Sequence, residues 1–282
     1  MTRWLTPPLA LLTLLLPATA QAGGWTQAEG AHYVKIWNRF ISGSNGFLAN
    51  GEIDELEGSY TDTSLNLYAE YGLTDDWTLV GYALPVGYAI GHQPDGASED
   101  DRQLYVGAAW AGVRRALLSD GPIKLAVEGH YGYTPSLGEE AVASGVVAGE
   151  PYVYVPAVES HRLDGELQLG YGLSGGMWLS LSGGYRQLFS DAELDPVVYG
   201  FAQYGWSGEQ VVVEGHLILN HPLGDVTGNN IAGSGQTRYV GLGFGLSYWF
   251  TPHVAANVGL DGAPYAASNA ATPSVLVGVE LR

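Results

Sequence analysis

The chain has no cysteine, so no disulfide contributes to its stability. Charged residues are also scarce, at 14% of the chain, while 11% are aromatic, and this combination argues against an intrinsically disordered protein. Among the charged residues, the basic ones are the fewer: the chain has 11 Lys and Arg and 29 Asp and Glu, which gives a formal net charge of −18. Nucleic-acid phosphates would repel so acidic a chain, and we therefore expect no nucleic-acid partner.

Long apolar runs are missing as well, which excludes a transmembrane helix. The N-terminus instead has a basic start at Met1-Thr2-Arg3, an apolar block from Leu9 to Leu16, and small residues at Ala20-Gln21-Ala22. This order is typical of an export signal, and the apolar block is far shorter than the ~20 residues that a spanning helix needs. The sequence predicts a cleaved signal peptide over residues 1–22 and a single domain over residues 23–282.

What the sequence has in abundance is alternation. From Leu163 to Tyr171 the odd positions are apolar or Gly and the even positions mostly polar, as in a strand with one apolar face. Ile123 to Tyr133 and Val240 to Tyr248 follow the same pattern. Twelve segments are predicted as strands: 31–42, 61–73, 77–91, 103–116, 122–134, 161–173, 177–189, 196–206, 210–221, 237–250, 253–263 and 274–282. Pro85 inside the third predicts a bulge, because proline cannot donate a ladder hydrogen bond.

The length of these segments separates two all-β folds. An exported β-sandwich also alternates, but its strands are usually about 5–6 residues long. A tilted strand in an outer-membrane barrel needs about 9–11 residues, which the predicted segments reach. The fold predicted is therefore an all-β, antiparallel, up-and-down transmembrane barrel of about twelve strands.

The links between the segments alternate between short and long. Short turns are predicted around residues 74–76, 174–176, 207–209 and 251–252, and long polar loops at 43–60, 92–102, 135–160 and 222–236. Bacterial outer-membrane barrels have short periplasmic turns and longer external loops, and an even strand number places both chain ends on the periplasmic side. The loop over 135–160 is long enough to fold inward and narrow the barrel.

Aromatic residues lie at both predicted ends of the barrel. We expect Trp77, Trp178, Trp206 and Trp249, each beside a short turn, to form a periplasmic aromatic girdle. Tyr60, Tyr88, Tyr131 and Tyr133 are expected in the outer girdle.

The faces opposite the apolar ones are predicted to line the lumen. Charges on the lipid face would cost roughly 2–4 kcal/mol for Arg or Lys near the midplane, so their gathering on one face supports the assignment. The lumen-lining candidates are Lys35, Arg39, Glu70, Lys124, Glu128, His130, Arg162, Asp164, Glu166, Arg186, Glu214, His216, Asp261 and Glu280. These charges either select solutes along a polar path or form salt bridges that fill the interior. Twelve strands do not decide between the two, since about eight strands are filled by side chains and 16–18 leave an aqueous channel.

The enzymatic alternative has little support in the sequence. Outer-membrane phospholipases and deacylases resemble one another in a His two residues before a Ser, and none of His130, His161 and His216 is followed in this way. No phosphate-binding loop, dinucleotide fingerprint, zinc-ligand cluster or nucleophile elbow is present, and Gly241 to Gly245 lies within an alternating strand. We expect no catalytic residue, no metal and no cofactor.

The segment Glu70-Tyr-Gly-Leu-Thr-Asp-Asp-Trp-Thr-Leu79 resembles the strand–turn–strand phrase of many outer-membrane barrels, and Tyr248 to His253 is a second copy of that turn. Among the families that share it is the transporter-like family associated with phenol-degradation (meta-pathway) operons. The resemblance implies a channel for hydrophobic or aromatic compounds. The chain departs from most barrels by ending on Arg282 instead of the aromatic residue that the assembly machinery reads.

The sequence therefore predicts an outer-membrane channel or transporter for passive or facilitated passage of small molecules. The alternative is a closed structural or recognition barrel that acts through its external loops, and an outer-membrane hydrolase is the least favoured reading. The expected partners are outer-membrane lipid, the barrel-assembly machinery and a small solute. The oligomeric state is left open.

Overall fold

The computed structural model describes residues 24–282 with the exception of 94–99, 148 and 227. The predicted signal peptide over 1–22 lies outside the described residues. Within the described part of the chain, no helix has the length and apolar character needed to cross a membrane.

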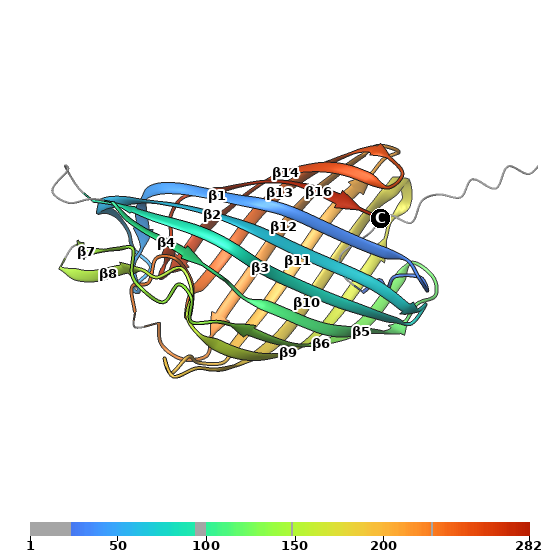
Figure 1. Ribbon diagram of the computed structural model, residues 1–282. Coiled ribbons are helices and arrows are strands. Elements are labelled where there is room, and N and C mark those ends of the chain that lie inside the picture. The colour runs from blue at the N-terminus through green and yellow to red at the C-terminus, as the bar shows by residue number, and fades with distance from the viewer. Residues whose placement is uncertain (1–23, 94–99, 148, 227) are drawn as a thin grey trace, which may run out of the picture.

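Twelve antiparallel wall strands close into one barrel, as predicted (Figure 1). Each follows its chain neighbour around the ring, and β1 closes the ring by pairing with both β2 and β16. The wall consists of β1 (His32–Phe47), β2 (Ile53–Thr74), β3 (Trp77–His92), β4 (Asp101–Tyr105) together with β5 (Ala109–Leu118), β6 (Ile123–Thr134), β9 (Ser160–Gly172), β10 (Met177–Phe189), β11 (Val197–Ser207), β12 (Val211–Pro222), β13 (Arg238–Thr251), β14 (Val254–Ala267) and β16 (Ser274–Leu281). Outside this set are the β7–β8 hairpin (Ala143–Val147 and Glu150–Tyr154), β15 (Asn269–Ala270) and a short 3₁₀ turn at Ser174–Gly176.

The fourth predicted strand, 103–116, is interrupted. β4 and β5 both pair with β3, and residues 106–108 between them lie opposite the Pro85 region. In the β2–β3 ladder, Leu65 pairs with Val86 and Leu67 with Ala83, so β3 carries one extra residue at this point. The bulge expected at Pro85 is therefore confirmed, and it is the reason why one wall strand consists of two parts.

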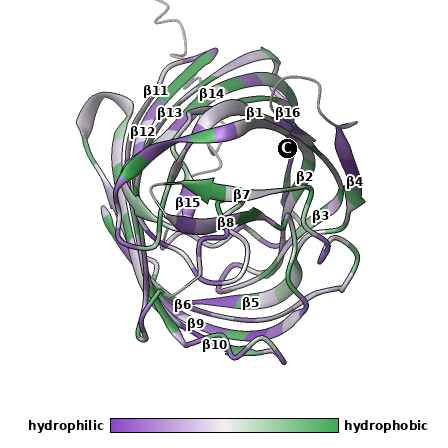
Figure 2. Ribbon diagram, turned by 90° about the vertical axis from the view of Figure 1, so that its left-hand side faces the viewer, coloured by the Kyte–Doolittle hydropathy of each residue, from purple (hydrophilic) through white to green (hydrophobic). Residues whose placement is uncertain are grey.

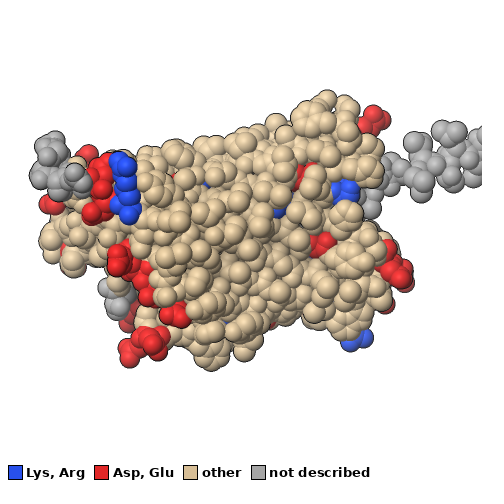
Figure 3. Space-filling model, in the orientation of Figure 1, with Lys and Arg blue, Asp and Glu red and all other residues tan. Residues whose placement is uncertain are grey.

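The alternation of the sequence becomes an inside and an outside. Leu163, Leu167, Phe244 and Val277 are at least half exposed on the outer surface of the isolated chain, while polar side chains between them point inward. Figure 3 shows the charged residues gathered toward the two ends of the barrel, with a wall between them that is mostly free of charge on this face. Such a surface is stable only against lipid, because water would meet a continuous apolar band.

The two ends of the barrel differ in the way the strands are connected. At the turn end, β2–β3, β9–β10, β11–β12 and β13–β14 are joined by two to four residues, and β1 begins and β16 ends there. At the loop end the connections are longer, as predicted. The predicted loop over 43–60 is wrong in part, because β1 and β2 continue to pair until Phe47 and Ile53. A bulge between Gly43 and Asn45 shifts the register, and the Asp and Glu residues of 52–57 hide the alternation.

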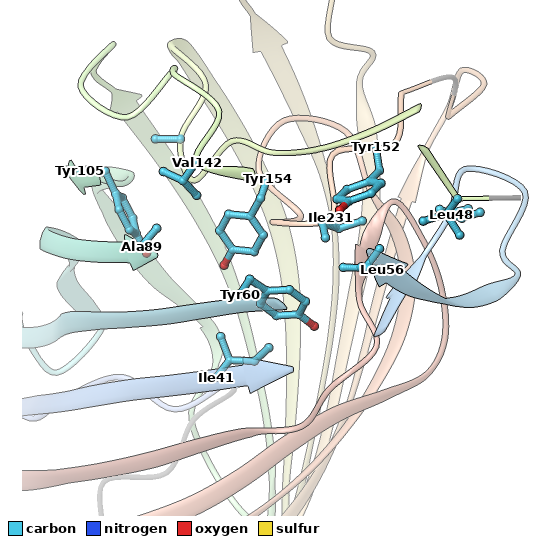
Figure 4. Close-up of a cluster of buried hydrophobic side chains, with 12 residues drawn as sticks. Ile41, Leu48, Leu56, Tyr60, Ala89, Tyr105, Val142, Tyr152, Tyr154 and Ile231 are labelled. Atoms are coloured by element: carbon cyan, nitrogen blue, oxygen red, sulfur yellow. The ribbon is translucent and has the colours of Figure 1, made fainter. Parts of the chain in front are cut away.

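Loops fold over the loop end and form a cap. The β7–β8 hairpin lies across the opening in Figure 2, and Val153 bridges to Asn230 of the β12–β13 loop. Beneath it, Tyr154 stacks on Tyr60 with ring centroids 5.2 Å apart (Figure 4). We define the cap as the loop segments 48–52, 135–159 and 223–237. The inward folding expected for residues 135–160 is thus observed.

Candidate functional site

A network of charged side chains covers one inner wall of the barrel. Its centre is Arg114 of β5, which is 3% exposed and donates to Glu70 of β2 (2.9 Å) and to Glu128 of β6 (2.5 Å). Glu128 also contacts His130 and accepts a hydrogen bond from Gln168 of β9 (3.0 Å). One guanidinium thus bridges two carboxylates from different strands, a geometry to which its planar fork is suited.

The network continues along β9 and β10 through Asp164. This carboxylate is contacted by Arg162, by Arg186 (3.1 Å) and by the Nδ1 atom of His130 (3.5 Å). Trp110 covers the His130 ring at a centroid distance of 4.3 Å. We call the charged side chains of this group the interior charge network: Glu70, Arg114, Glu128, His130, Arg162, Asp164 and Arg186. Nearly every charge in it therefore has a partner of opposite sign.

The N-terminal segment, residues 24–30, is docked on this network. The Trp25 ring lies where a side chain on Gly170 would stand, since a Cβ atom there would be 2.4 Å from the ring. Arg114 donates to the Trp25 carbonyl (3.0 Å), and the Gln27 side chain donates to Glu70 (2.5 Å). The Gln27 amide donates to the Thr78 hydroxyl (2.8 Å). The segment therefore enters the barrel at the turn end and narrows that mouth.

The opposite inner wall borders a cavity of about 450 Å³ in the half of the lumen nearer the turn end. Its lining comes from β1, β2, β10–β14 and β16, and it combines aromatic with charged side chains. The aromatic side chains that point into it are Tyr33, Trp37, Tyr68, Trp178, Phe201 and Trp249, and the charged or ionisable ones are Lys35, Glu70, Glu214, His216, Asp261, Glu280 and Arg282. A volume of this size is typical of a small-molecule site.

Two contacts bring the polar groups of the cavity together. His216 Nε2 lies 3.1 Å from Asp261 Oδ1, and this pair crosses Gly243, where a Cβ atom would lie 2.1 Å from the carboxylate. Lys35 Nζ lies 3.8 Å from Glu280, which also accepts a hydrogen bond from Ser247 (2.8 Å). Only a glycine on β13 permits the first of these contacts, because any side chain would occupy the space between the two groups.

The fourteen lumen-lining candidates all stand at inward-facing register positions. Six of them border the cavity: Lys35, Glu70, Glu214, His216, Asp261 and Glu280. The others are Arg39, which pairs with Asp62 near the loop end (3.4 Å), Lys124, which donates to the Ser119 carbonyl at the turn end, and Glu128, His130, Arg162, Asp164, Glu166 and Arg186, which lie in or beside the interior charge network. His130 and His216 have different partners, and among the described residues no group of three His, Asp or Glu side chains is placed to hold a metal ion.

The predicted periplasmic girdle is half wrong. Trp77 and Trp206 are 40% and 44% exposed on the outside, whereas Trp178 and Trp249 are 2% and 5% exposed and border the cavity. Proximity to a turn fixes how deep a residue lies in the membrane, but the alternation fixes its face, and both buried rings fall at inward positions. Tyr60 is likewise not in an outer girdle, since its ring is buried under the cap.

Arg114 is the functional-site residue that the sequence analysis missed. It lies next to Arg115 in the interrupted strand, so the two arginines point to opposite faces and the pattern alone does not say which is inside. The available signal was Val113, an apolar residue that shares the outer face with Arg115. Arg115 ends near the turn end, where its guanidinium lies 5.2 Å from the Trp77 ring.

Comparison with known proteins gives a fold. No protein-family model matches the chain, and no curated protein matches its sequence. The structure is similar to that of an outer-membrane channel from Pseudomonas putida F1, with a TM-score of 0.60, 12% identity, and 93% of this chain and 98% of the channel covered. Other similar structures are the translocator domain of the autotransporter NalP from Neisseria meningitidis (TM-score 0.49, 14% identity, 91% and 89% covered) and the toluene transporter TodX from Pseudomonas putida (0.44, 8%, 90% and 89%). The likeness to the channel establishes a shared barrel fold.

Proposed function

We propose that the mature chain is an outer-membrane channel through which small molecules pass, and that it is not an enzyme. The observation that carries the proposal is the cavity of about 450 Å³, bordered by aromatic and charged side chains inside a closed barrel. A barrel whose interior served only as filler would have no need of such a space, because its side chains would occupy it.

The path proposed for the solute runs along the β10–β16 side of the lumen, opposite the interior charge network. The cap narrows this path at the loop end and the N-terminal segment narrows it at the turn end. The cap and the N-terminal segment are held to the barrel by side-chain contacts and isolated hydrogen bonds, whereas the wall strands are held together by long backbone ladders. Local opening of the cap or of the segment therefore costs less free energy than separating two wall strands. We propose that the fourteen inward residues act on the passing solute or hold the network that shapes its path.

The proposed passengers have an apolar or aromatic body, because six aromatic rings border the cavity. The resemblance to the family of phenol-degradation operons supports the same class of passenger. The similar structure from Pseudomonas putida F1 is that of an outer-membrane channel, which supports passage through the barrel.

The test is single-channel conductance of the refolded chain from Gly23 onward in a planar bilayer, after heat-modifiable migration on a gel has shown that it is folded. We expect discrete, reproducible current steps. Glu128→Ala and Arg162→Ala should change the size or ion preference of those steps, because each substitution unbalances the charges that face the path. A folded, inserted barrel that passes no current in any variant would overturn the proposal.

A second function is favoured by one observation, the packing of the cap. Its buried cluster includes Leu48, Tyr152, Tyr154 and Ile231 from three separate loops. This packing holds the loops in one conformation, as a recognition surface requires. Replacing residues 141–157 by a short Gly-Ser link distinguishes the two functions. An increase in conductance supports a channel gated by the cap, whereas a silent barrel both before and after the deletion supports a closed barrel that acts through its loops.

A further inference from the structure

We propose that the cavity binds organic cations that carry an aromatic or other apolar body. The proposal rests on the channel function above and names the class of solute that the channel takes. Its positive group would lie among Glu214, Asp261 and Glu280, and its apolar body against the rings of Trp37 and Phe201.

The first argument is the balance of charge around the cavity. Of its four carboxylates, Glu70 is already paired with Arg114 on the opposite wall. Glu280 lies 3.8 Å from Lys35, and Asp261 lies 3.1 Å from His216, its one ion-pair partner among the described residues. Glu214 accepts a hydrogen bond from Gln203 (2.7 Å), and no Lys, Arg or His of the described residues forms an ion pair with it. Three carboxylates on β12, β14 and β16 therefore face two permanent cations, Lys35 and Arg282, in a confined space, which leaves one negative charge in excess.

This surplus of negative charge favours a cationic ligand. A carboxylate removed from bulk water without a counter-charge is costly, so a cation that enters the cavity is stabilised by the groups already there. On the neighbouring strand β13, Gly243 and Gly245 carry no side chains, so the acidic side chains of β12 and β14 lie over the backbone there and face the cavity. A Cβ atom on Gly245 would lie only 2.8 Å from the Glu214 carboxylate.

The second argument is a buried acceptor that has no donor. Gln203 is 6% exposed and borders the cavity, and it uses its amide nitrogen to donate to Glu214. Its Oε1 atom accepts no hydrogen bond from any described residue. An ammonium group beside Glu214 would supply both the counter-charge for the carboxylate and a donor for this oxygen.

The third argument is that cations of the protein already lie on aromatic faces at this cavity. Lys35 Nζ is 5.8 Å from the centre of the Trp37 ring, and the Arg282 guanidinium is 3.7 Å from that of Trp249. Cations are attracted to the faces of Trp rings, and recognition of quaternary ammonium by aromatic side chains is a common use of this contact. Phe201, stacked on His216 at 5.7 Å, bounds the opposite side.

The experiment compares three probes of similar size that differ in charge: benzyltrimethylammonium, benzyl alcohol and benzenesulfonate. Each is added to the refolded channel in a planar bilayer, and its binding to the folded barrel in detergent is measured by calorimetry. We expect the cation alone to block the current and to bind. Glu214→Gln should raise its half-blocking concentration about tenfold, the loss expected for one charged contact.

The matched control is Glu166→Gln. Glu166 also points inward and also accepts a hydrogen bond from a glutamine, Gln168 (2.8 Å), but it does not border the cavity. We expect this variant to keep the half-blocking concentration of the unaltered channel. Equal block by the cation and the alcohol, or equal effects of the two substitutions, would overturn the proposal while the channel function stands. A silent barrel that still binds the cation by calorimetry would overturn the channel function and leave the site in place.

Discussion

At the scale of single residues, the interior of this barrel depends on Arg114. Its guanidinium is the common partner of Glu70 and Glu128, and it also donates to the carbonyl of Trp25. The three groups belong to β2, β6 and the N-terminal segment, which are distant in sequence. One buried cation thus links side chains and backbone from three separate parts of the chain.

Replacing Arg114 with alanine should therefore destabilise the barrel strongly. The change leaves Glu70 and Glu128 buried without their cation, and breaking a buried ion pair in this way costs roughly 3–5 kcal/mol. We expect the free energy of unfolding to fall by about that amount in a denaturant titration of the refolded protein. Arg115→Ala is the control, because Arg115 is exposed and its guanidinium lies over the Trp77 ring, a contact worth about 0.5–1 kcal/mol. Equal losses for the two variants would contradict the role assigned to Arg114.

The sequence predicts the face of a residue better than it predicts its partner. Alternation alone places Glu214, Asp261 and Glu280 inside, because the residue before each of them, Val213, Leu260 and Val279 respectively, is an apolar residue of the outer face. It does not tell that Asp261 meets His216 across Gly243, since this contact depends on register over three strands. Trp249 could have been placed correctly, because it follows Tyr248, which ends the apolar face of the alternating run from Val240.

At the scale of elements, predictions fail where the ladder is irregular. The long wall strands from β9 to β12 follow the predicted segments closely, since uninterrupted pairing keeps the period of two. The division of residues 103–116 into β4 and β5, and the extension of β1 and β2 past the predicted loop at 43–60, both lie beside bulges. A bulge shifts the alternation by one residue, and its position follows from pairing with another strand.

The N-terminal segment is an element that no periodicity could reveal, because it has no secondary structure. It is held in the mouth at the turn end by two contacts. The Trp25 ring packs against Gly170, and Gln27 donates hydrogen bonds to Glu70 and Thr78. A chain that begins at Ala31 should fold as before, since Glu70 keeps Arg114 as its partner.

Removal of this segment should enlarge the channel. We expect the unit conductance to rise by roughly twofold or more, because pore-lining groups at the narrow mouth set the current. Planar-bilayer recordings of chains that begin at Gly23 and at Ala31 provide the comparison. Trp206→Ala serves as the control, because that ring lies on the outside of the same end and should not affect the current. Unchanged conductance after truncation would mean that the segment does not lie in the path.

At the scale of the whole molecule, the outer surface should tolerate charge according to depth. Leu167 lies midway along β9, pairs with Val127 and Gly183, and is 54% exposed on the outside. Leu167→Arg should lower the free energy of unfolding from a lipid bilayer by about 2–4 kcal/mol, and Leu223→Arg at the loop end by about 0–1 kcal/mol. Reversible guanidinium titrations in liposomes measure both values. In a soluble barrel, the loss in the free energy of unfolding would not depend on the depth of the substituted residue. A small loss for Leu167→Arg would therefore argue for a soluble barrel.

The direction of the barrel in the membrane follows from the asymmetry of its two ends. Every long connection, with the cap, lies at one end, and the short turns lie with the first and last wall strands at the other. Since outer-membrane barrels keep their short turns in the periplasm, the β7–β8 hairpin should face the medium.

The side of the membrane on which each end lies can be tested by labelling. The chain has no cysteine, so a single introduced cysteine reports its own side without background. We expect Ser144→Cys in β7 to react with a membrane-impermeant maleimide on intact Gram-negative cells, and Glu209→Cys in the β11–β12 turn to react only after the outer membrane is opened. Both residues are exposed in the folded chain, so a difference in their labelling reports protection by the outer membrane and not burial within the protein. The reverse pattern would place the cap and its loops in the periplasm and would remove the basis for an external gate.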